Sequence, residues 1–227
     1  MKNKKLVIAL ILLAAVAILA FAWLTRQPNT TQTAGQASQA EAPAEQATDQ
    51  ITMSLDEYLK TGGQDWFLTG KKEYPVQGMM VSKETSFHND LEVVDYTVTD
   101  DDTTVILKGT QDEMWASKLP KVEVTYTKPD GSKISQKDFQ NKDTYIDLVA
   151  IPQPDANYAM FVPNDISVTV KTAWGDELHT NLPNAPHGDG DFLVCRKGDD
   201  GQPDLTDVWI LNGVIFPDTY DTSHYSK

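Results

Sequence analysis

Cysteine is nearly absent from this chain of 227 residues, which contains only Cys195. A lone cysteine excludes an intrachain disulfide, and Cys195 lies too far from the N-terminal apolar run to carry the lipid of a lipoprotein. Because the residues around it follow an apolar strand pattern, the sequence favours a buried, inert thiol over a nucleophile.

The signatures of common enzyme classes are also missing. The sequence contains no Gly-x-Ser-x-Gly, no dinucleotide-binding glycine pattern, no His-Glu-x-x-His and no Cys-x-x-Cys. The Gly70-Lys71 pair lacks both the earlier glycine and the following Ser or Thr of a phosphate-binding loop. A Ser-His-Asp arrangement that assembles only in space leaves no such trace. Sequence motifs therefore indicate no particular reaction.

Positive charge is scarce. Lysine and arginine number 19 against 33 aspartates and glutamates, which sets the formal net charge at −14. Beyond residue 50 the imbalance is 15 against 30. A nucleic-acid surface needs a basic patch, so the composition predicts no nucleic-acid partner. The same repulsion disfavours adsorption to anionic lipid headgroups, and an acidic, solvated exterior is expected.

A single long apolar run is present, at the N-terminus. Residues 6–24 form an uncharged stretch of 19 residues, near the roughly 20 that a helix needs to cross a bilayer. Three lysines precede it and mark the cytoplasmic side. We therefore expect residues 1–25 to form a signal-anchor transmembrane helix in the plasma membrane, single-pass, with the remaining chain extracytoplasmic. The residues expected to anchor it include Leu6, Ile11, Leu19 and Trp23.

Cleavage of this segment is the alternative. Ala20-Phe21-Ala22 has the small-x-small form that a signal peptidase accepts, and cleavage there would make the protein secreted. Retention is favoured because apolar character continues through Trp23 and Leu24, with Arg26 as a flank. Both alternatives predict export of the rest of the chain.

The next segment, residues 26–50, has no large apolar side chain after Arg26 and is rich in Gln, Thr, Ala and Ser. Such a composition cannot bury enough surface to offset its chain entropy, so a disordered linker is predicted. Folded sequence is expected from residue 51, with a β-sandwich-like domain over 51–180 and a small β module over 181–227.

Local signals from residue 51 onward predict a mainly β fold. A capping box at Ser54 and Glu57 predicts a short helix that ends at Gly62. Helical spacing predicts two further helices, at 111–118 and 135–141. Period-two alternation between turn residues is typical of an antiparallel β-sandwich. It predicts strands at 92–98, 103–108, 122–126, 145–149, 158–162, 166–171, 191–196, 207–211 and 214–216.

The last third reads as a C-terminal β-meander, because Asn212-Gly213 between apolar runs is a strong hairpin signal. Its residues also carry a family pattern in Gly190-Asp191-Phe192-Leu193-Val194, Val208-Trp209-Ile210 and Phe216-Pro217-Asp218-Thr219-Tyr220-Asp221. About 35 residues thereby resemble the PGDYG family, a small bacterial and phage module. They depart from it at Asp189, Phe192 and Asp221, where the family has Pro, Tyr and Glu. The resemblance implies a compact β-unit and no particular chemistry.

Two acidic clusters could hold a cation. In an extended chain His187, Asp189 and Asp191 share one side, and one imidazole with two carboxylates suits a divalent metal. The favoured alternative is a glycine-rich turn whose acidic side chains bond their own backbone, so no cofactor is predicted. The second cluster, between Asp199 and Asp207, lacks the register of an EF-hand loop and is read as a solvated hairpin tip.

Large aromatic side chains provide a third kind of candidate. Trp66 and Trp174 could offer a stacking surface for a sugar or peptide, although burial is the usual state of such side chains. Their exposure separates the two interpretations.

Three functions from different classes remain. The first is a non-catalytic, membrane-anchored extracytoplasmic domain that binds or scaffolds another component of the bacterial cell envelope, a protein or a polysaccharide. The second is a hydrolase, metal-dependent or otherwise, that acts on envelope material through His187, Asp189 and Asp191. The third is a carbohydrate- or peptide-binding module that uses Trp66 and Trp174. The absence of a chemical motif favours the first.

Overall fold

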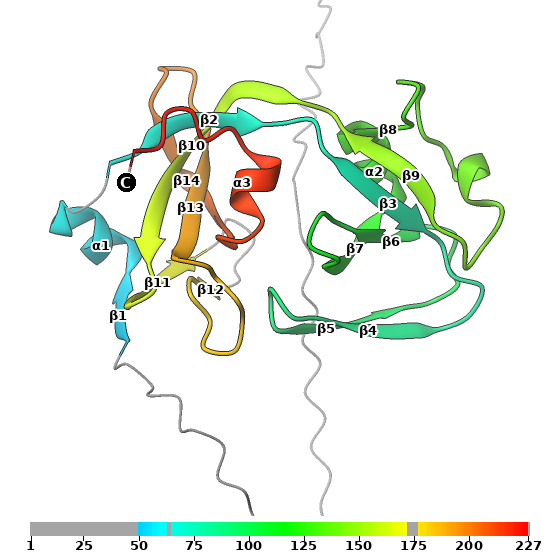
Figure 1. Ribbon diagram of the computed structural model, residues 1–227, viewed down its shortest axis with the longest axis horizontal. Helices are drawn as coiled ribbons and strands as arrows, with labels where there is room; N and C mark the ends of the chain where they lie inside the picture. The colour runs from blue at the N-terminus through cyan, green and yellow to red at the C-terminus, as the bar shows by residue number, and fades with distance from the viewer. Residues whose placement is uncertain (1–49, 63–64, 172–176, 227) are drawn as a thin grey trace, which may run out of the picture. The chain divides into compact units, whose positions relative to one another are not determined.

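The computed structural model describes residues 50–62, 65–171 and 177–226 (Figure 1). The predicted membrane helix, with Leu6, Ile11, Leu19 and Trp23, and nearly all of the predicted linker lie outside these residues, as does Trp174. Within the described ranges, no helix has both the length and the apolar character needed to cross a membrane. Membrane anchoring therefore stays a prediction.

The described chain is mainly β, with several antiparallel sheets and few short helices, and this confirms the predicted class. One four-stranded sheet has the order β14-β13-β10-β2, and one three-stranded sheet has the order β1-β11-β12. Their bounds are β1 Ile51–Ser54, β2 Phe67–Lys71, β10 Gln153–Pro163, β11 Ile166–Lys171, β12 Glu177–His179, β13 Gly190–Lys197 and β14 Pro203–Leu211.

An apolar core lies between these two sheets. Met160 and Leu193 from the four-stranded sheet meet Val168 and Val170 from β11, and the helix α1, Leu55–Thr61, adds Tyr58. Since alternate residues of a strand point to opposite faces, Val168 and Val170 of β11 are buried together as predicted. Ile166 is only partly buried, and Ser167 on the other face is buried as well. The two sheets therefore pack around one core, and two of their strands, β13 and β14, come from the segment after residue 180.

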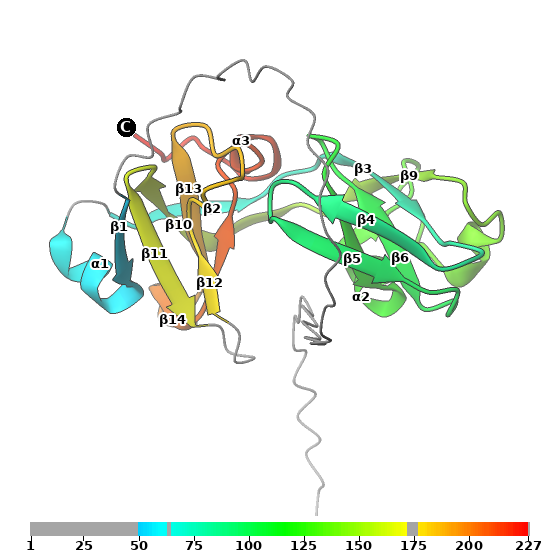
Figure 2. The same cartoon turned by 90° about the horizontal axis from the view of Figure 1, so that it is seen from below.

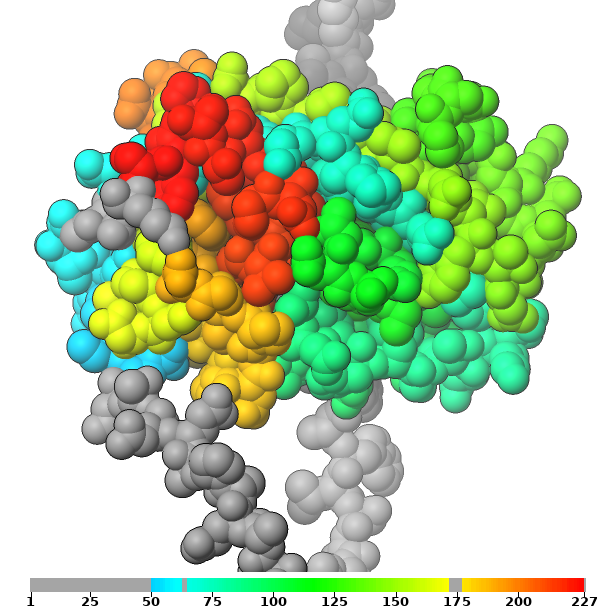
Figure 3. All heavy atoms as spheres, in the orientation of Figure 1, coloured from blue at the N-terminus to red at the C-terminus, as the bar shows by residue number. Residues whose placement is uncertain are grey.

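The opposite face of the four-stranded sheet carries an aromatic cluster. Phe192 and Phe216 stack with ring centroids 3.8 Å apart, and Phe67 meets Phe216 edge-on at 6.1 Å. Phe216 opens the short helix α3, Phe216–Thr219, and Tyr220 follows it. Figure 3 shows the C-terminal residues in red lying over this region. The C-terminal segment thus covers a sheet face that would otherwise be exposed.

A second group of strands forms a five-stranded sheet, β7-β6-β3-β9-β8, and a two-stranded hairpin, β4-β5 (Figure 2). The hairpin packs on one face of the sheet around Val81, Val98 and Ile106. The helices α2 and η1 supply Val122 and Phe139 to the core on the other face. The bounds are β3 Pro75–Met79, β4 Thr85–Asn89, β5 Val94–Val98, β6 Thr104–Lys108, β7 Met114–Lys118, α2 Leu119–Thr125, β8 Tyr126–Thr127, η1 Gln136–Phe139 and β9 Ile146–Ala150.

The two groups of strands are interleaved along the chain. β2 belongs to the first group and β3 to the second, while β9 belongs to the second and β10 to the first. β13 pairs with β10 over residues 190–197, so the 181–227 segment completes a sheet begun by earlier strands and forms no sheet of its own. The described residues belong to one compact unit.

The predicted helices that begin at a capping box are present. Ser54 accepts from the Glu57 amide at 3.3 Å, the Glu57 carboxylate accepts from the Ser54 amide at 2.8 Å, and Gly62 ends α1 at φ 64°. The predicted helix at 135–141 is the 3-10 turn η1, with Phe139 buried.

Two predictions between residues 111 and 126 were wrong. The predicted helix at 111–118 contains strand β7, which pairs with β6, and the predicted strand at 122–126 is mostly helix α2. Pro120 occupies the first turn of α2, where its missing amide costs nothing. Leu119 and Val122 are buried at helical spacing, whereas Val124 is 63% exposed. Burial therefore selected the helical period over the strand period.

The predicted hairpin at Asn212-Gly213 was also wrong, because the residues after it enter α3. The Asn212 carbonyl accepts from the amides of Ile215 and Phe216, and Pro217 lies in the first turn of the helix. A Cβ at Gly213 would collide with the Gly190 carbonyl. This glycine permits close backbone approach and supplies no positive φ.

Candidate functional site

The predicted His187–Asp191 cluster lies in the loop that leads into β13, and its members hold loops together. Asp191 is buried at 3% exposure and accepts hydrogen bonds from the Asn181 amide at 2.6 Å and the Gly213 amide at 2.9 Å. A buried carboxylate is tolerated when such donors replace its water shell. Asp191 thus joins the loop before β13 to the loop after β14.

The Asn181 side chain in turn bonds Asp191. Its side-chain oxygen accepts from the Asp191 amide at 2.9 Å, so the two residues bond each other reciprocally. The Asn181 amide group donates to the carbonyls of Val162, Pro163 and Ile166, at the turn between β10 and β11. Asn181 adopts φ 54°, a left-handed conformation that asparagine tolerates better than most residues.

The His187 imidazole bonds the protein on both sides. Its Nε2 lies 2.6 Å from the Leu182 carbonyl and its Nδ1 lies 3.3 Å from the Asp191 carboxylate. Both ring nitrogens therefore have protein partners in the loops. The structure therefore brings His187 and Asp191 together for packing of the loops.

Asp189 lies in the same loop and takes part in an interaction of its own. Among the described residues, no three His, Cys, Asp or Glu side chains form a group that could hold a metal ion. The acidic side chains near residue 200 bond their own turns instead. Asp200 accepts from the Gln202 amide at 3.0 Å, and Asp204 accepts from the Thr206 amide at 3.0 Å.

Two further candidates are packed into the core. Cys195 has 0% exposure, and burial, with the charge of Asp204 as a smaller cause, raises the pKa of its thiol to about 12. A thiol with that pKa is not a nucleophile near neutral pH. Trp66 is partly buried against the core between the four-stranded and three-stranded sheets.

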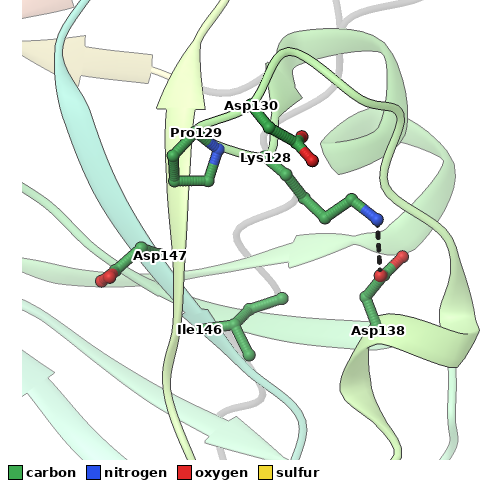
Figure 4. A pocket seen from close by; sticks show the side chains of 6 residues that line it. All are labelled: Lys128, Pro129, Asp130, Asp138, Ile146 and Asp147. Carbon is green, nitrogen blue, oxygen red and sulfur yellow. Dashed lines mark hydrogen bonds and ion pairs between the residues drawn. The ribbon is translucent and has the colours of Figure 1, made fainter.

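Open hollows lie on the described surface. One is lined by Lys128, Pro129, Asp130, Asp138, Ile146 and Asp147 (Figure 4). In it the Lys128 ammonium pairs with Asp138 at 2.9 Å, while Asp147 points away from the pair. The hollow is lined by one lysine and three aspartates, so it is formally negative. It offers neither the enclosure nor the convergent groups that are typical of a small-molecule pocket.

A cluster that sequence analysis missed lies at the end of β2. The Lys71 ammonium stands 5.5 Å from the centre of the Tyr74 ring and 5.3 Å from that of Tyr126. Such cation–π contacts favour a positive charge. Burial raises the pKa values of the Tyr74 and Tyr126 hydroxyls, and it raises that of Tyr220 to about 12, so these neighbours are neutral. We call Lys71, Tyr74, Tyr126 and Tyr220 the lysine–tyrosine cluster.

No carboxylate lies within 4 Å of the Lys71 ammonium in the described part of the chain. Burial lowers its pKa to about 8, and the positive charge of Lys121 adds to the effect. Lys121 itself has a lowered pKa, caused by burial and then by Arg196, with Asp207 opposing. Three cations thus gather in a domain that is strongly acidic.

The cluster's residues are distant in sequence, since they belong to β2, the β2–β3 connection, β8 and the residue after α3. No spacing pattern could have indicated them. The Gly70-Lys71 pair, rejected as a phosphate loop, was the one local signal, and it lies in a strand rather than a loop.

Comparison with known proteins found no match to this chain among family models, curated proteins or solved structures. The resemblance of the C-terminal residues to the PGDYG family stays a prediction.

We expect His187→Ala to lower the free energy of unfolding by about 1–3 kcal/mol, because it leaves the buried Asp191 carboxylate with one donor fewer. Denaturant unfolding of the purified protein measures the change. The exposed His224→Ala serves as the control and should stay within about 0.5 kcal/mol of the parent. A midpoint of the parent protein that falls on addition of a chelator would contradict the assignment of His187 to loop packing.

Replacing Lys71 should reveal its charge through pH. Since the folded pKa of about 8 lies below the ordinary 10.5, the unfolded chain binds more protons between these values, and stability rises with pH across that window. Lys71→Met removes this contribution. The variant should be more stable than the parent at pH 7, and the difference should shrink between pH 8 and 10.

Denaturant titrations at pH 7, 8, 9 and 10 measure this difference, with the exposed Lys60→Met as the matched control. A stability difference between Lys71→Met and the parent that stays constant over the window would show that Lys71 is solvated normally.

Proposed function

We propose that this protein is a membrane-anchored, extracytoplasmic domain with a non-catalytic binding or scaffolding role in the bacterial cell envelope. The anchor and linker come from the sequence: an uncharged run follows three lysines, and a polar segment rich in small residues separates it from the folded domain. On this proposal the N-terminal segment holds the domain at the outer face of the plasma membrane.

The observation that carries the non-catalytic part is the state of the reactive side chains. His187 and Asp191, the best catalytic candidates, have their hydrogen-bonding atoms committed to Leu182, Asn181 and Gly213. A general acid or base must have an atom available to the substrate within hydrogen-bond reach. These two side chains can supply one only if the loops that they join separate.

The architecture supports a binding role. The chain forms two β structures with separate cores and passes between them twice. The outer surfaces of these structures are far larger than the hollows described above. Protein and polymer partners are recognised on such surfaces without an enclosed pocket. The net negative charge would favour a partner with complementary basic groups.

The first test is orientation. Protease added to intact cells that express the full chain with a C-terminal tag should remove the tag, while a cytoplasmic marker survives. In cells with an outer membrane, that membrane is permeabilised first. Protection of the tag until the plasma membrane is broken would place the domain on the wrong side.

The second arm of the same test addresses binding. The full chain, purified in detergent and immobilised, should retain an envelope component saturably and release it to competing free chain. Heat-denatured chain is the control. The proposal would be contradicted if neither the protein fraction nor the polysaccharide fraction of the envelope bound saturably.

A further inference from the structure

We propose that the lysine–tyrosine cluster, together with Lys121 and Arg196, is a binding site for an oxyanion, either a carboxylate or a phosphate. The inference deepens the proposed function, since it assigns a ligand chemistry to one surface of a binding protein. It also stands on separate evidence, namely two cations on one sheet face, Lys71 and Arg196, and a third, Lys121, on the helix α2 near Lys71.

The sheet register places the cations. Alternate residues of a strand share a face, so Lys71 lies on the same face as Phe67, and Arg196 lies on the same face as Phe192. Phe67 and Phe192 belong to the aromatic cluster. Asn157 of β10 is the register partner of both Thr69 and Arg196, which sets β2 and β13 on either side of one strand. The face is thus aromatic at one end and basic at the other.

The backbone at Lys71 is held from two sides. Lys71 pairs with Gln153 of β10 and forms a bridge with Tyr220. The Lys72 amide donates to the Thr219 carbonyl at 2.8 Å, and the Asp221 amide donates to the Gly70 carbonyl at 3.0 Å. The strand that carries the Lys71 ammonium is therefore held by backbone bonds on both sides.

The charge balance at this place is unusual for this protein. Anions outnumber cations two to one beyond residue 50, yet no carboxylate of the described residues lies within 4 Å of the Lys71 ammonium. Arg196 has Asp207 at 3.7 Å and Asp204 as its register partner on β14, so the uncompensated charge is that of Lys71. A poorly solvated ammonium without a counter-charge is unfavourable, and a bound anion would relieve that cost. The interaction is strongest where water is excluded. The site therefore favours an anion over a neutral ligand.

The groups available define the ligand class. The ammonium groups of Lys71 and Lys121 and the guanidinium of Arg196 all donate. Donors of these kinds recognise carboxylate and phosphate oxygens. The anion could come from a small free solute or from an anionic group on an envelope polymer. The shared chemistry is one oxyanion with two or more free oxygens.

The test uses the full chain in detergent and titrates it calorimetrically with sodium phosphate, sodium acetate and a polyphosphate, each against sodium chloride of equal ionic strength. We expect saturable binding of phosphate or acetate by the parent protein. Lys71→Met should abolish it, and Lys121→Met should weaken it by about tenfold or more. The exposed Lys60→Met is the control and should bind as the parent does.

Tighter binding of the polyphosphate than of phosphate, lost in Lys71→Met, would identify a polymer as the source of the anion. Equal affinities per phosphate would identify a small solute. Heats equal to those of chloride for all three probes would overturn the inference, as would binding unchanged in Lys71→Met. Thermal unfolding of each variant verifies that it is folded. When a folded variant does not bind, the loss of binding is assigned to the site. Failure here leaves the orientation and capture results standing, so the two proposals are separable.

Discussion

The reciprocal hydrogen bonds between Asn181 and Asp191 are the constraint on which the packing of the four-stranded and three-stranded sheets depends. Each residue's side chain accepts from the other's backbone amide, at 2.6 and 2.9 Å, and the pair lies where β10 turns into β11 and where β13 begins. The Gly213 amide completes the carboxylate's shell, so the turn after β14 is bound to the same point. Because leaving one buried partner unsatisfied costs about 1–3 kcal/mol, each member keeps the others in place. Residues that in another setting would suit catalysis or metal binding are here structural.

The charged side chains of the domain are also mostly structural, with one exception. Most charged side chains bond turns or each other on the surface, as with Lys142 against Asp100 and Asp102, and such exposed pairs contribute little to stability. Lys71 is the exception, because its ammonium lies over two tyrosine rings and no carboxylate of the described residues lies within 4 Å of it. A fold that keeps an uncompensated cation in a poorly solvated place retains it at a cost, which is consistent with a ligand that supplies the missing charge.

Sequence predicted those features whose causes are local. The capping box at Ser54, the alternation in β11 and the burial of Cys195 all follow from neighbours a few residues away. Where two periods fitted equally, as at Val122 and Val124, contacts with distant strands decided between helix and strand. At Gly213 the deciding contact was the Gly190 carbonyl, which no short pattern reveals. The lysine–tyrosine cluster was beyond reach for the same reason, since its members meet only after β2 and α3 have joined.

The central claim, that the His187–Asp191 region is a closed structural joint, is tested most directly by native-state hydrogen exchange. The amides of Asn181, Asp191 and Gly213 donate to side chains within the joint, and we expect them to exchange as slowly as the core amides of β13. The Ser223 amide, which donates to the Asp221 carboxylate, should exchange far faster and calibrates the scale. Exchange of the three joint amides at the rate of Ser223 would show that the loops open readily and leave His187 and Asp191 free for chemistry, which would contradict a closed joint.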